Sequence, residues 1–330
     1  MRILTATDIE GLLPVTALVR AIEEALRATL THEVSVPVRS HLQWSGGTLL
    51  TMPAIDSRAI GVKLVSVIPG NSARQMPVTS GTMLLLDATT GEATALLDAT
   101  TLTAQRTGAI GATALKWMTP PDLSSVGVIG IGAQGTSLAI AACATRPIRQ
   151  ICYLARSAAS ESRFRQKVLA SVQNVELIAC RSGIDLLQRV GTIITATTSS
   201  QPVLPDDPAL LQGRQVFAFG SFTPAMQEVP GSLAQLAGNI VVDADAARVE
   251  SGDVINPLQQ GALQPADIMH LAEIVAGQKR LRNTATTLFK SVGMAAYDLF
   301  VAQLILQEAV GRKAGASVNL ENGCGRRGPF

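Results

Sequence analysis

The first third of the chain combines one helical hydrophobic pattern with several short strand-like runs. Apolar residues recur three or four positions apart over residues 7–30, which predicts an amphipathic helix whose start is bent or delayed by Pro14. The turn sequence Asp87-Ala-Thr-Thr-Gly91 predicts a hairpin. Strands are predicted at Val34–Leu42, Thr48–Met52, Ala59–Ile68, Thr82–Leu86 and Ala93–Leu97. This pattern indicates an antiparallel α+β module.

The pattern changes after a helix predicted at Thr100–Met118, which Thr119-Pro-Pro-Asp122 ends. From residue 124 to about 250, strands and helices alternate, which is typical of a parallel α/β sheet. Strands are predicted at Gln150–Ala155, Thr192–Thr197, Gln215–Gly220 and Asn239–Asp243, and a last helix at Met294–Val310. We therefore predict an α/β protein with a Rossmann-type dinucleotide-binding domain over 119–293. An α+β substrate-binding domain covers 1–118, with 294–313 returning to it, and residues 314–330 form a mobile tail.

The run Val126-Gly-Val-Ile-Gly-Ile-Gly-Ala-Gln-Gly135 is a dinucleotide fingerprint between a predicted strand and a predicted helix. Gly130 permits the tight turn, Gly132 lets the backbone approach a pyrophosphate, and Gly135 lets helix and strand pack closely. Ala133 and Gln134 begin the helix, whose free N–H groups and positive dipole favour phosphate. We expect all five residues to bind the cofactor.

The second half of the motif indicates which dinucleotide is preferred. An NAD-binding sequence places Asp or Glu at the end of the second strand, where it binds the ribose 2′-hydroxyl. Here that strand is followed by Arg156 and Ser157, and the next carboxylate is Glu161. A guanidinium and a hydroxyl can bind a 2′-phosphate, so we expect NADPH to be preferred, with NADH as a possible second donor.

The segments after later strands are expected to line the cofactor crevice, because ligands of open α/β sheets lie beyond the carboxyl ends of the strands. Candidate nicotinamide contacts are Thr197, Thr198, Gly220 and Ser221. Glu228, a few residues further along, is interpreted as an anchor for the loop after the fifth strand.

Composition narrows the class of protein further. The 330 residues are 47% hydrophobic with a formal net charge of +2, which gives no electrostatic argument for nucleic-acid or membrane partners. No apolar run is long enough for a membrane span, and the N-terminus lacks the apolar core of a signal peptide. The four cysteines show no paired metal spacing and are typical of a reducing, cytoplasmic compartment. We predict no metal site.

The N-terminal module carries cations in places where a surface role does not explain them. Arg39 and His41 are two apart in a predicted strand and so share a face, Lys63 interrupts an apolar strand, and Arg106 lies in a segment of small residues. Three cations converging on one pocket can hold a carboxylate. Thr79 precedes a predicted strand and can hold cofactor or substrate oxygens.

These residues resemble the ornithine cyclodeaminase and mu-crystallin family. The resemblance rests on Val38-Arg39-Ser-His41, Gly61-Val-Lys63-Leu-Val65, Pro77-Val-Thr-Ser-Gly81, Thr103-Ala-Gln-Arg-Thr-Gly-Ala109 and Thr287-Leu-Phe-Lys-Ser-Val-Gly293 with Asp298, and it covers residues 1 to about 312. It implies that Arg39, Lys63 and Arg106 bind the substrate carboxylate and that Val292 and Gly293 contact the cofactor. It also implies a homodimer assembled through the N-terminal module.

Departures from the family motifs bear on the reaction, because family members include cyclodeaminases, reductases, dehydrogenases and dehydratases. Cyclodeaminases carry an Asp where this chain has Phe222 and a Glu where it has Leu50. Both carboxylates that would handle a diamine are missing. The form Gly220-Ser-Phe-Thr-Pro224 resembles bacterial reductases of the cyclic ketimines Δ1-pyrroline-2-carboxylate and Δ1-piperideine-2-carboxylate, which make L-proline and L-pipecolate.

The resemblance thus implies hydride delivery to C2 of a cyclic imine whose carboxylate is held by the three cations. Lys63, His41 or solvent supplies the proton that the imine nitrogen needs, and His41 has the better unperturbed pKa for it. Three alternatives stay open: a lyase that releases ammonia from ornithine, a hydroxyproline dehydratase, and a non-catalytic NADPH-binding protein.

Overall fold

The computed structural model describes residues 1–283 and 285–319, and its contacts divide the chain into two compact units. Unit 1 comprises Met1–Pro14, His32–Thr103 and the described residues from Ala295 onward. Unit 2 comprises Val15–Thr31 and Ala104–Met294. The division falls inside a helix, at Thr103, whereas the sequence pattern suggested a boundary at Thr119–Asp122. The reason is that most of this helix packs with the Rossmann-type domain.

Unit 1 is built on a seven-stranded sheet with the order β15-β1-β6-β5-β4-β3-β2. All neighbours are antiparallel except β1 and β6, which are parallel. The strands are β1 (Arg2–Leu4), β2 (Ser40–Trp44), β3 (Gly47–Ile55), β4 (Ala59–Val67), β5 (Thr79–Asp87), β6 (Ala93–Asp98) and β15 (Ala316–Ser317). The short helices α1 (Ala6–Ile9) and η1 (Pro69–Arg74) complete the loops.

The predicted hairpin between β5 and β6 is confirmed. The Asp87 side chain accepts hydrogen bonds from the backbone N–H groups of Thr89 and Thr90, and Gly91 adopts φ +75°. This arrangement needs a short acceptor side chain at the start of the turn and a residue that tolerates positive φ at its end. The sequence from Asp87 to Gly91 supplies both.

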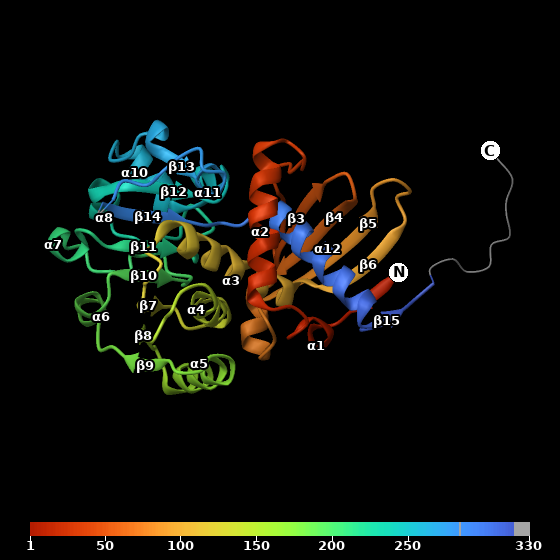
Figure 1. Cartoon of the computed structure of the whole chain (residues 1–330), viewed down its shortest axis with the longest axis horizontal. Coiled ribbons are helices and arrows are strands. Elements are labelled where there is room, and N and C mark those ends of the chain that lie inside the picture. The colour runs from red at the N-terminus through yellow and green to blue at the C-terminus, as the bar shows by residue number, and fades with distance from the viewer. Residues whose placement is uncertain (284, 320–330) are drawn as a thin grey trace, which may run out of the picture. The chain divides into compact units, whose positions relative to one another are not determined.

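Helix α12 (Ala295–Gly311) covers one face of this sheet and packs on β3, β4 and β5 (Figure 1). The central strands meet it with a buried row in which Met52, Lys63 and Met83 are register partners. Gly61 lets the helix approach, since a Cβ there would lie 2.9 Å from the Leu299 side chain. A lysine therefore lies in the apolar row beneath α12.

Unit 2 contains an eight-stranded sheet with the order β13-β12-β14-β11-β10-β7-β8-β9, in which every pairing is parallel. The strand order reverses between β7 and β10. The strands are β7 (Ser125–Ile129), β8 (Gln150–Leu154), β9 (Glu176–Ala179), β10 (Thr192–Thr195), β11 (Gln215–Ala218), β12 (Ala237–Val242), β13 (Ile268–His270) and β14 (Thr286–Lys290).

Helices cover both faces of this sheet, with α4 and α5 on one side and α6, α7 and α8 on the other (Figure 1). The helices of the unit are α2 (Val15–Leu30), most of α3 (Ala99–Met118), α4 (Ala133–Thr145), α5 (Ala158–Ser171), α6 (Gly183–Arg189), α7 (Pro208–Leu211), α8 (Gly231–Leu236), α9 (Ala247–Glu250), α10 (Gly252–Gln259), η2 (Pro265–Asp267) and α11 (Leu271–Val275). The core includes Phe289, whose ring centroid lies 5.8 Å from that of Phe217 and 5.7 Å from that of Phe219. Burial of these apolar rings stabilises the sheet.

The small residues of the segment 102–111 are explained by the close packing of α3 on α4. A Cβ added to Gly108 would lie 2.6 Å from the Ser137 hydroxyl, and one added to Gly111 would lie 2.3 Å from the Leu138 side chain. The Ser137 hydroxyl also donates to the Ala104 carbonyl at 2.7 Å.

Several boundaries differ from the predicted ones. The predicted N-terminal helix is divided at Pro14 into α1 and α2, since proline cannot donate the hydrogen bond that a continuous helix requires. The strand expected at Val34–Leu42 begins only at Ser40. Residues 314–319, expected in the mobile tail, are held by β15, which pairs with β1, and by hydrogen bonds between Met1 and Val318. The rest of the predicted tail, 320–330, lies outside the described residues.

The three described cysteines are free thiols, and Cys143 and Cys180 are partly exposed. Cys152 is buried, and burial raises the pKa of the Cys143 and Cys152 thiols to about 11. Cys324 lies outside the described residues.

Candidate functional site

The glycine turn after β7 has the geometry that the fingerprint predicts. Gly130 adopts φ +93°, and a Cβ there would lie 2.4 Å from the Ala196 carbonyl oxygen. A Cβ on Gly135 would lie 1.9 Å from the Gly130 carbonyl oxygen, so only glycine allows α4 to start this close to the strand. A Cβ on Gly132 would meet nothing within 4 Å. The turn is packed tightly on the protein side and open above Gly132, where a pyrophosphate can approach.

Helix α4 starts directly from this turn. Gly132 is its N-cap, and Ala133 and Gln134 form its exposed first turn. Their backbone N–H groups belong to the four that an α-helix leaves without an intrahelical partner. Because β7 and β10 flank the point where the strand order reverses, these donors lie at the switch point of the sheet.

The end of β8 presents a cation and a hydroxyl at the start of α5. Arg156 and Ser157 are both exposed, and Ser157 caps α5 by accepting from the Ser160 N–H at 3.2 Å. Glu161, the nearest carboxylate in sequence, accepts a 2.6 Å hydrogen bond from the Tyr153 hydroxyl. One oxygen of the Glu161 carboxylate is therefore engaged with Tyr153.

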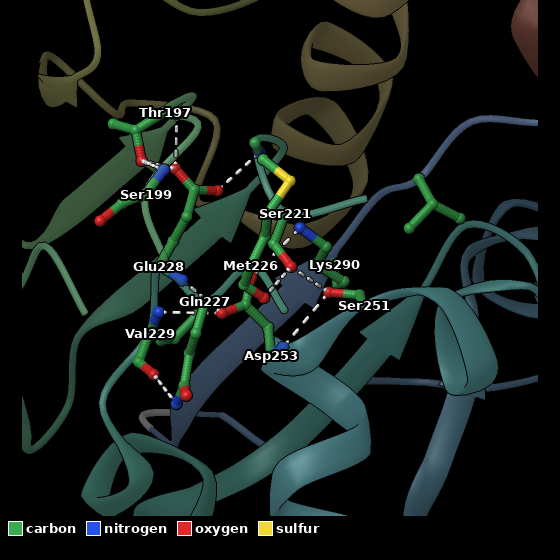
Figure 2. A network of polar contacts seen from close by, with 12 residues as sticks. Thr197, Ser199, Ser221, Met226, Gln227, Glu228, Val229, Ser251, Asp253 and Lys290 are labelled. Carbon is green, nitrogen blue, oxygen red and sulfur yellow. Dashed lines mark hydrogen bonds and ion pairs between the residues drawn. The ribbon is translucent and has the colours of Figure 1, made fainter. Parts of the chain in front are cut away.

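Glu228 ties together the loops that follow β10 and β11 (Figure 2). It is fully buried, and one carboxyl oxygen accepts from the Thr197 N–H at 2.6 Å and from the Thr197 hydroxyl at 2.8 Å. The other oxygen accepts from the Gly220 N–H at 2.6 Å. Burial raises the pKa of Glu228, while nearby Lys290 and these hydrogen bonds act in the opposite direction. The interpretation of Glu228 as a loop anchor agrees with these contacts.

The buried ion pair between Asp253 and Lys290 holds the backbone at Glu228 (Figure 2). Asp253, at the start of α10, accepts from the backbone N–H groups of Glu228 and Val229 at 2.7 and 2.9 Å. Its other oxygen lies 3.2 Å from the Lys290 ammonium, and both side chains are fully buried. The ends of β10, β11 and β14 are thereby linked through one polar network.

The predicted nicotinamide contacts differ in how the structure uses them. Thr198 is exposed, whereas the Thr197 hydroxyl is committed to Glu228. Ser221 is fully buried, and its hydroxyl donates to the Met226 carbonyl at 2.6 Å and lies 2.8 Å from the Ser251 hydroxyl. The Ser221 side chain therefore holds its own loop.

In unit 1, Lys63 has an acidic partner, as a charged side chain within a buried apolar strand requires. Its ammonium lies 2.6 Å from the Asp298 carboxylate, and the two side chains are 2% and 0% exposed. The ammonium also lies 3.5 Å from the Thr103 hydroxyl. Asp298 comes from α12, which covers the sheet, so the helix that buries Lys63 also neutralises it.

His41 and Thr79 lie on the same face of the sheet as Lys63. His41 pairs with Leu50 and Leu50 with Val65, two residues from Lys63, while Thr79 pairs with Val67. Paired residues and residues two apart share a face. Strand spacing places His41 roughly 12 Å from Lys63, too far for direct contact. Both His41 and Thr79 are exposed.

Arg39 was predicted to lie inside a strand, but it comes just before β2, which begins at Ser40. Its side chain is half-buried. The chain before Ser40 forms only an isolated bridge at Ser35, because Pro37 interrupts backbone pairing.

Arg106, on α3, is 7% exposed, and its guanidinium packs against Gly293. Val292 and Gly293 form the segment after β14 and donate their N–H groups to the Asp243 carboxylate at 3.0 and 2.9 Å. In unit 2 the structure therefore brings the predicted substrate arginine against the predicted cofactor segment.

Three acidic or basic residues of these networks were not assigned to the site from the sequence: Asp298, Asp253 and Lys290. Each is almost completely buried. Lys290 ends a strand of otherwise apolar and threonine residues, the same signal that singled out Lys63. Asp298 lies in the first turn of α12, where acidic residues are common because they favour the positive end of the helix dipole. Its place in the sequence therefore gave no reason to pair it with Lys63.

A parallel sheet wound on both faces, with this glycine turn at its switch point, defines a dinucleotide-binding protein. Residues 1–313 match the profile of the ornithine cyclodeaminase/mu-crystallin family, and the chain belongs to this family.

Relatives of known name cover nearly the whole chain. The chain is 31% identical over 326 residues to the Δ1-pyrroline-2-carboxylate reductase of Bacillus cereus, covering 96% of this chain and 99% of that protein. It is 31% identical to the Δ1-pyrroline-2-carboxylate/Δ1-piperideine-2-carboxylate reductase of Azospirillum brasilense, covering 94% and 96% of the two chains.

Among solved structures, the fold is similar to Thermococcus litoralis Δ1-pyrroline-2-carboxylate reductase in complex with NADH and L-proline. The TM-score is 0.90 at 29% identity, covering 96% of this chain and all of that one. An archaeal alanine dehydrogenase dimer with bound NAD gives a TM-score of 0.88 at 25% identity, covering 97% of this chain and 99% of that one.

Over the part of the chain that the structure describes, no helix combines the length and apolarity that crossing a membrane requires. The same residues contain no group of three or more His, Cys, Asp or Glu side chains placed to hold a metal ion.

Proposed function

We propose that this protein is a reductase that uses a nicotinamide dinucleotide to reduce the cyclic ketimines Δ1-pyrroline-2-carboxylate and Δ1-piperideine-2-carboxylate to L-proline and L-pipecolate. The observation that carries the proposal is the full-length similarity to two reductases named for these substrates. Position 222 supports it, since a 46% exposed Phe222 stands where cyclodeaminases carry an Asp.

The reaction adds a hydride to C2 of the ring and a proton to the imine nitrogen, and the bound dinucleotide supplies the hydride. The residues of the glycine turn fit such a cofactor, because Gly132 faces open space beside the free N–H groups of α4. Val292, Gly293, Gly220 and Thr198 are the contacts proposed for its nicotinamide end.

Arg39, Lys63 and Arg106 hold the substrate carboxylate in this proposal. An ammonium and two guanidinium groups give charge-assisted hydrogen bonds, and a guanidinium can bind both carboxylate oxygens. Asp298 lies 2.6 Å from the Lys63 ammonium, and an opposite charge at this distance stabilises the charged form of a buried amine. Fixing the carboxylate presents one face of C2 for hydride transfer, which is worth several powers of ten in rate.

The proton for the imine nitrogen is assigned to His41 or to solvent. His41 is exposed on the face of the sheet that carries Lys63, and an imidazole titrates near neutral pH. If His41 is the donor, His41→Asn alters the pH dependence of kcat/KM. An unchanged pH profile would assign His41 to the scaffold.

The preferred donor in this proposal is NADPH. Arg156 and Ser157 lie exposed at the start of α5, a helix N-terminus that favours a phosphate, and Glu161 is committed to Tyr153. Arg156→Asp is expected to raise the KM for NADPH by about 10- to 100-fold while the KM for NADH changes far less. Equal effects on the two cofactors would remove Arg156 from the 2′-phosphate site.

The chain assembles as a homodimer in this proposal, through the edge strand β2 of unit 1. All five residues of β2 are exposed, and Leu42 and Trp44 are 66% and 49% exposed. An open strand edge with apolar side chains is a pairing surface. Light scattering of the purified protein should give the mass of two chains, and Leu42→Glu should shift it toward one. A monomeric wild type contradicts this part of the proposal.

The first experiment mixes the protein with NADPH and either ketimine. It follows NADPH absorbance, resolves the product by chiral chromatography and assays ammonia. Loss of absorbance with formation of L-proline or L-pipecolate establishes the reductase. Ammonia release from ornithine without NADPH consumption would establish the lyase instead. Formation of the cyclic imine from trans-3-hydroxy-L-proline would establish the dehydratase, and NADPH binding without turnover would leave a binding protein.

A further inference from the structure

The Arg106 guanidinium lies directly against the Cα of Gly293. A Cβ built on Gly293 would lie 2.3 Å from Nη1, 2.9 Å from Cζ and 2.9 Å from Nη2 of Arg106. These distances are far below van der Waals contact, and they involve most of the guanidinium plane. Any side chain at position 293 would therefore displace the end of Arg106.

Gly293 is itself held in place by Asp243, which follows β12. The Asp243 carboxylate accepts from the Ser291 hydroxyl at 2.6 Å and from the Val292 and Gly293 N–H groups at 3.0 and 2.9 Å. All of these donors are buried. Three hydrogen bonds to one carboxylate fix a segment that contains no regular structure.

We propose that Asp243 and Gly293 are positioning residues, which set where the Arg106 guanidinium lies relative to the nicotinamide-contacting segment 292–293. The inference rests on the proposed function, in which Arg106 binds the substrate carboxylate. In this proposal the segment 292–293 contacts the cofactor and also holds the Arg106 guanidinium in place. The position of the substrate carboxylate relative to the cofactor is therefore set by residues of a single compact unit.

A backbone requirement alone does not explain glycine at this position. Gly293 adopts φ +70°, but Gly277 adopts φ +73° with nothing within 4 Å of an added Cβ. An alanine at either position meets the same left-handed backbone strain. Only at position 293 does the new methyl group meet the substrate arginine. The pair Gly293→Ala and Gly277→Ala therefore separates displacement of Arg106 from backbone strain.

The test compares these two variants with Arg106→Ala and Asp243→Asn. KM and kcat for the ketimine come from steady-state kinetics, Kd for NADPH from fluorescence titration in the absence of ketimine, and Tm from thermal melting. Gly293→Ala is expected to raise the ketimine KM about tenfold or more, and by a larger factor than it raises Kd for NADPH. Gly277→Ala should lower Tm to a similar extent and leave the ketimine KM unchanged. Asp243→Asn should reproduce the KM increase in weaker form.

The outcomes distinguish the role of Arg106 in binding the substrate carboxylate from the role of Gly293 in positioning Arg106. If Arg106→Ala leaves the ketimine KM unchanged, the carboxylate role of Arg106 fails and the proposed site is wrong. If Arg106→Ala raises KM but Gly293→Ala behaves like Gly277→Ala, only the positioning role is wrong. A Gly293→Ala variant that weakens NADPH binding while retaining the ketimine KM would assign Gly293 to the cofactor alone and overturn the inference.

Discussion

Each compact unit contains a buried lysine–aspartate pair, and these two pairs are arranged differently. In unit 1, Lys63 lies 2.6 Å from Asp298 within the row of side chains beneath α12. In unit 2, Lys290 lies 3.2 Å from Asp253, whose other oxygen accepts hydrogen bonds from the backbone N–H groups of Glu228 and Val229. The second pair joins chain segments to one another. The first pair holds Lys63, one of the three cations proposed to bind the substrate carboxylate.

The difference teaches that burial of a lysine does not by itself identify a site. Both lysines are equally hidden, and both sit in strands of apolar character. The two pairs differ in where the aspartate lies. Asp253 also accepts from the backbone N–H groups of Glu228 and Val229 and so helps to fix a loop, whereas Asp298 lies on the helix that covers the sheet. The following predictions test this distinction, beginning with the largest effect.

Lys290→Met should lower the free energy of unfolding by about 3–5 kcal/mol, because it leaves Asp253 buried without its cation. Denaturant unfolding measures this change. Lys279→Met is the matched control: Lys279 is 42% exposed and lies 3.0 Å from Glu273, and its loss should cost no more than about 1 kcal/mol. Equal costs for the two variants would mean that the Lys290 pair does not stabilise the network.

Lys63→Met should reduce kcat/KM for the ketimine by about 100-fold, because a charge-assisted contact to the substrate carboxylate is lost. Stability should fall as well, since Asp298 becomes an unpaired buried carboxylate. The double variant Lys63→Met/Asp298→Asn removes that charge and should recover part of the stability but none of the activity. Recovery of both would make the Lys63 pair structural, like that of Lys290.

Glu228→Gln should weaken NADPH binding by about tenfold, measured by fluorescence titration. Glutamine keeps one acceptor oxygen but turns an NH₂ group toward either the Gly220 or the Thr197 N–H, which are both donors. Glu176→Gln, at an exposed position in β9, is the control and should leave Kd unchanged. Unaltered NADPH affinity in Glu228→Gln would show that the loops after β10 and β11 keep their places without this anchor.

The pH dependence of stability should report the smallest effect. Burial raises the pKa of Glu228, so the folded chain binds a proton there more tightly than the unfolded chain does. The contribution of this group to the free energy of unfolding therefore declines as pH rises from the ordinary glutamate pKa through the raised one. Unfolding measured from pH 4 to 8 should show this decline in the wild type and lose it in Glu228→Gln. Parallel curves would contradict the raised pKa.

The sequence predicted the cofactor half of the protein closely. Gly130, Gly132 and Gly135 each have the surroundings that their roles require, because a turn, a strand and a helix start are local structures encoded by neighbouring residues. The hairpin at Asp87–Gly91 was predictable for the same reason. Strand boundaries were less accurate, as at Ser40, because they depend on a pairing partner.

The polar side chains that complete the sites could not be predicted in the same way. Lys63 and Asp298 are 235 positions apart in sequence, and Arg106 and Gly293 are also far apart in sequence. The family motifs include most of these residues, but they do not indicate which residues contact one another. Ser221, expected at the cofactor, turned its hydroxyl to Met226 and Ser251 instead.

The sequence by itself therefore determined the Rossmann-type fold, the glycine turn and the family, and it singled out the cations that we propose bind the substrate, since each rests on a local pattern or on residue identity. The tertiary structure decided which aspartate neutralises each buried lysine, that Glu228 spans two loops, and that Gly293 carries Arg106. The physical reason is that a buried charge is stable only beside a partner. Only the packing of distant segments determines which residue that partner is.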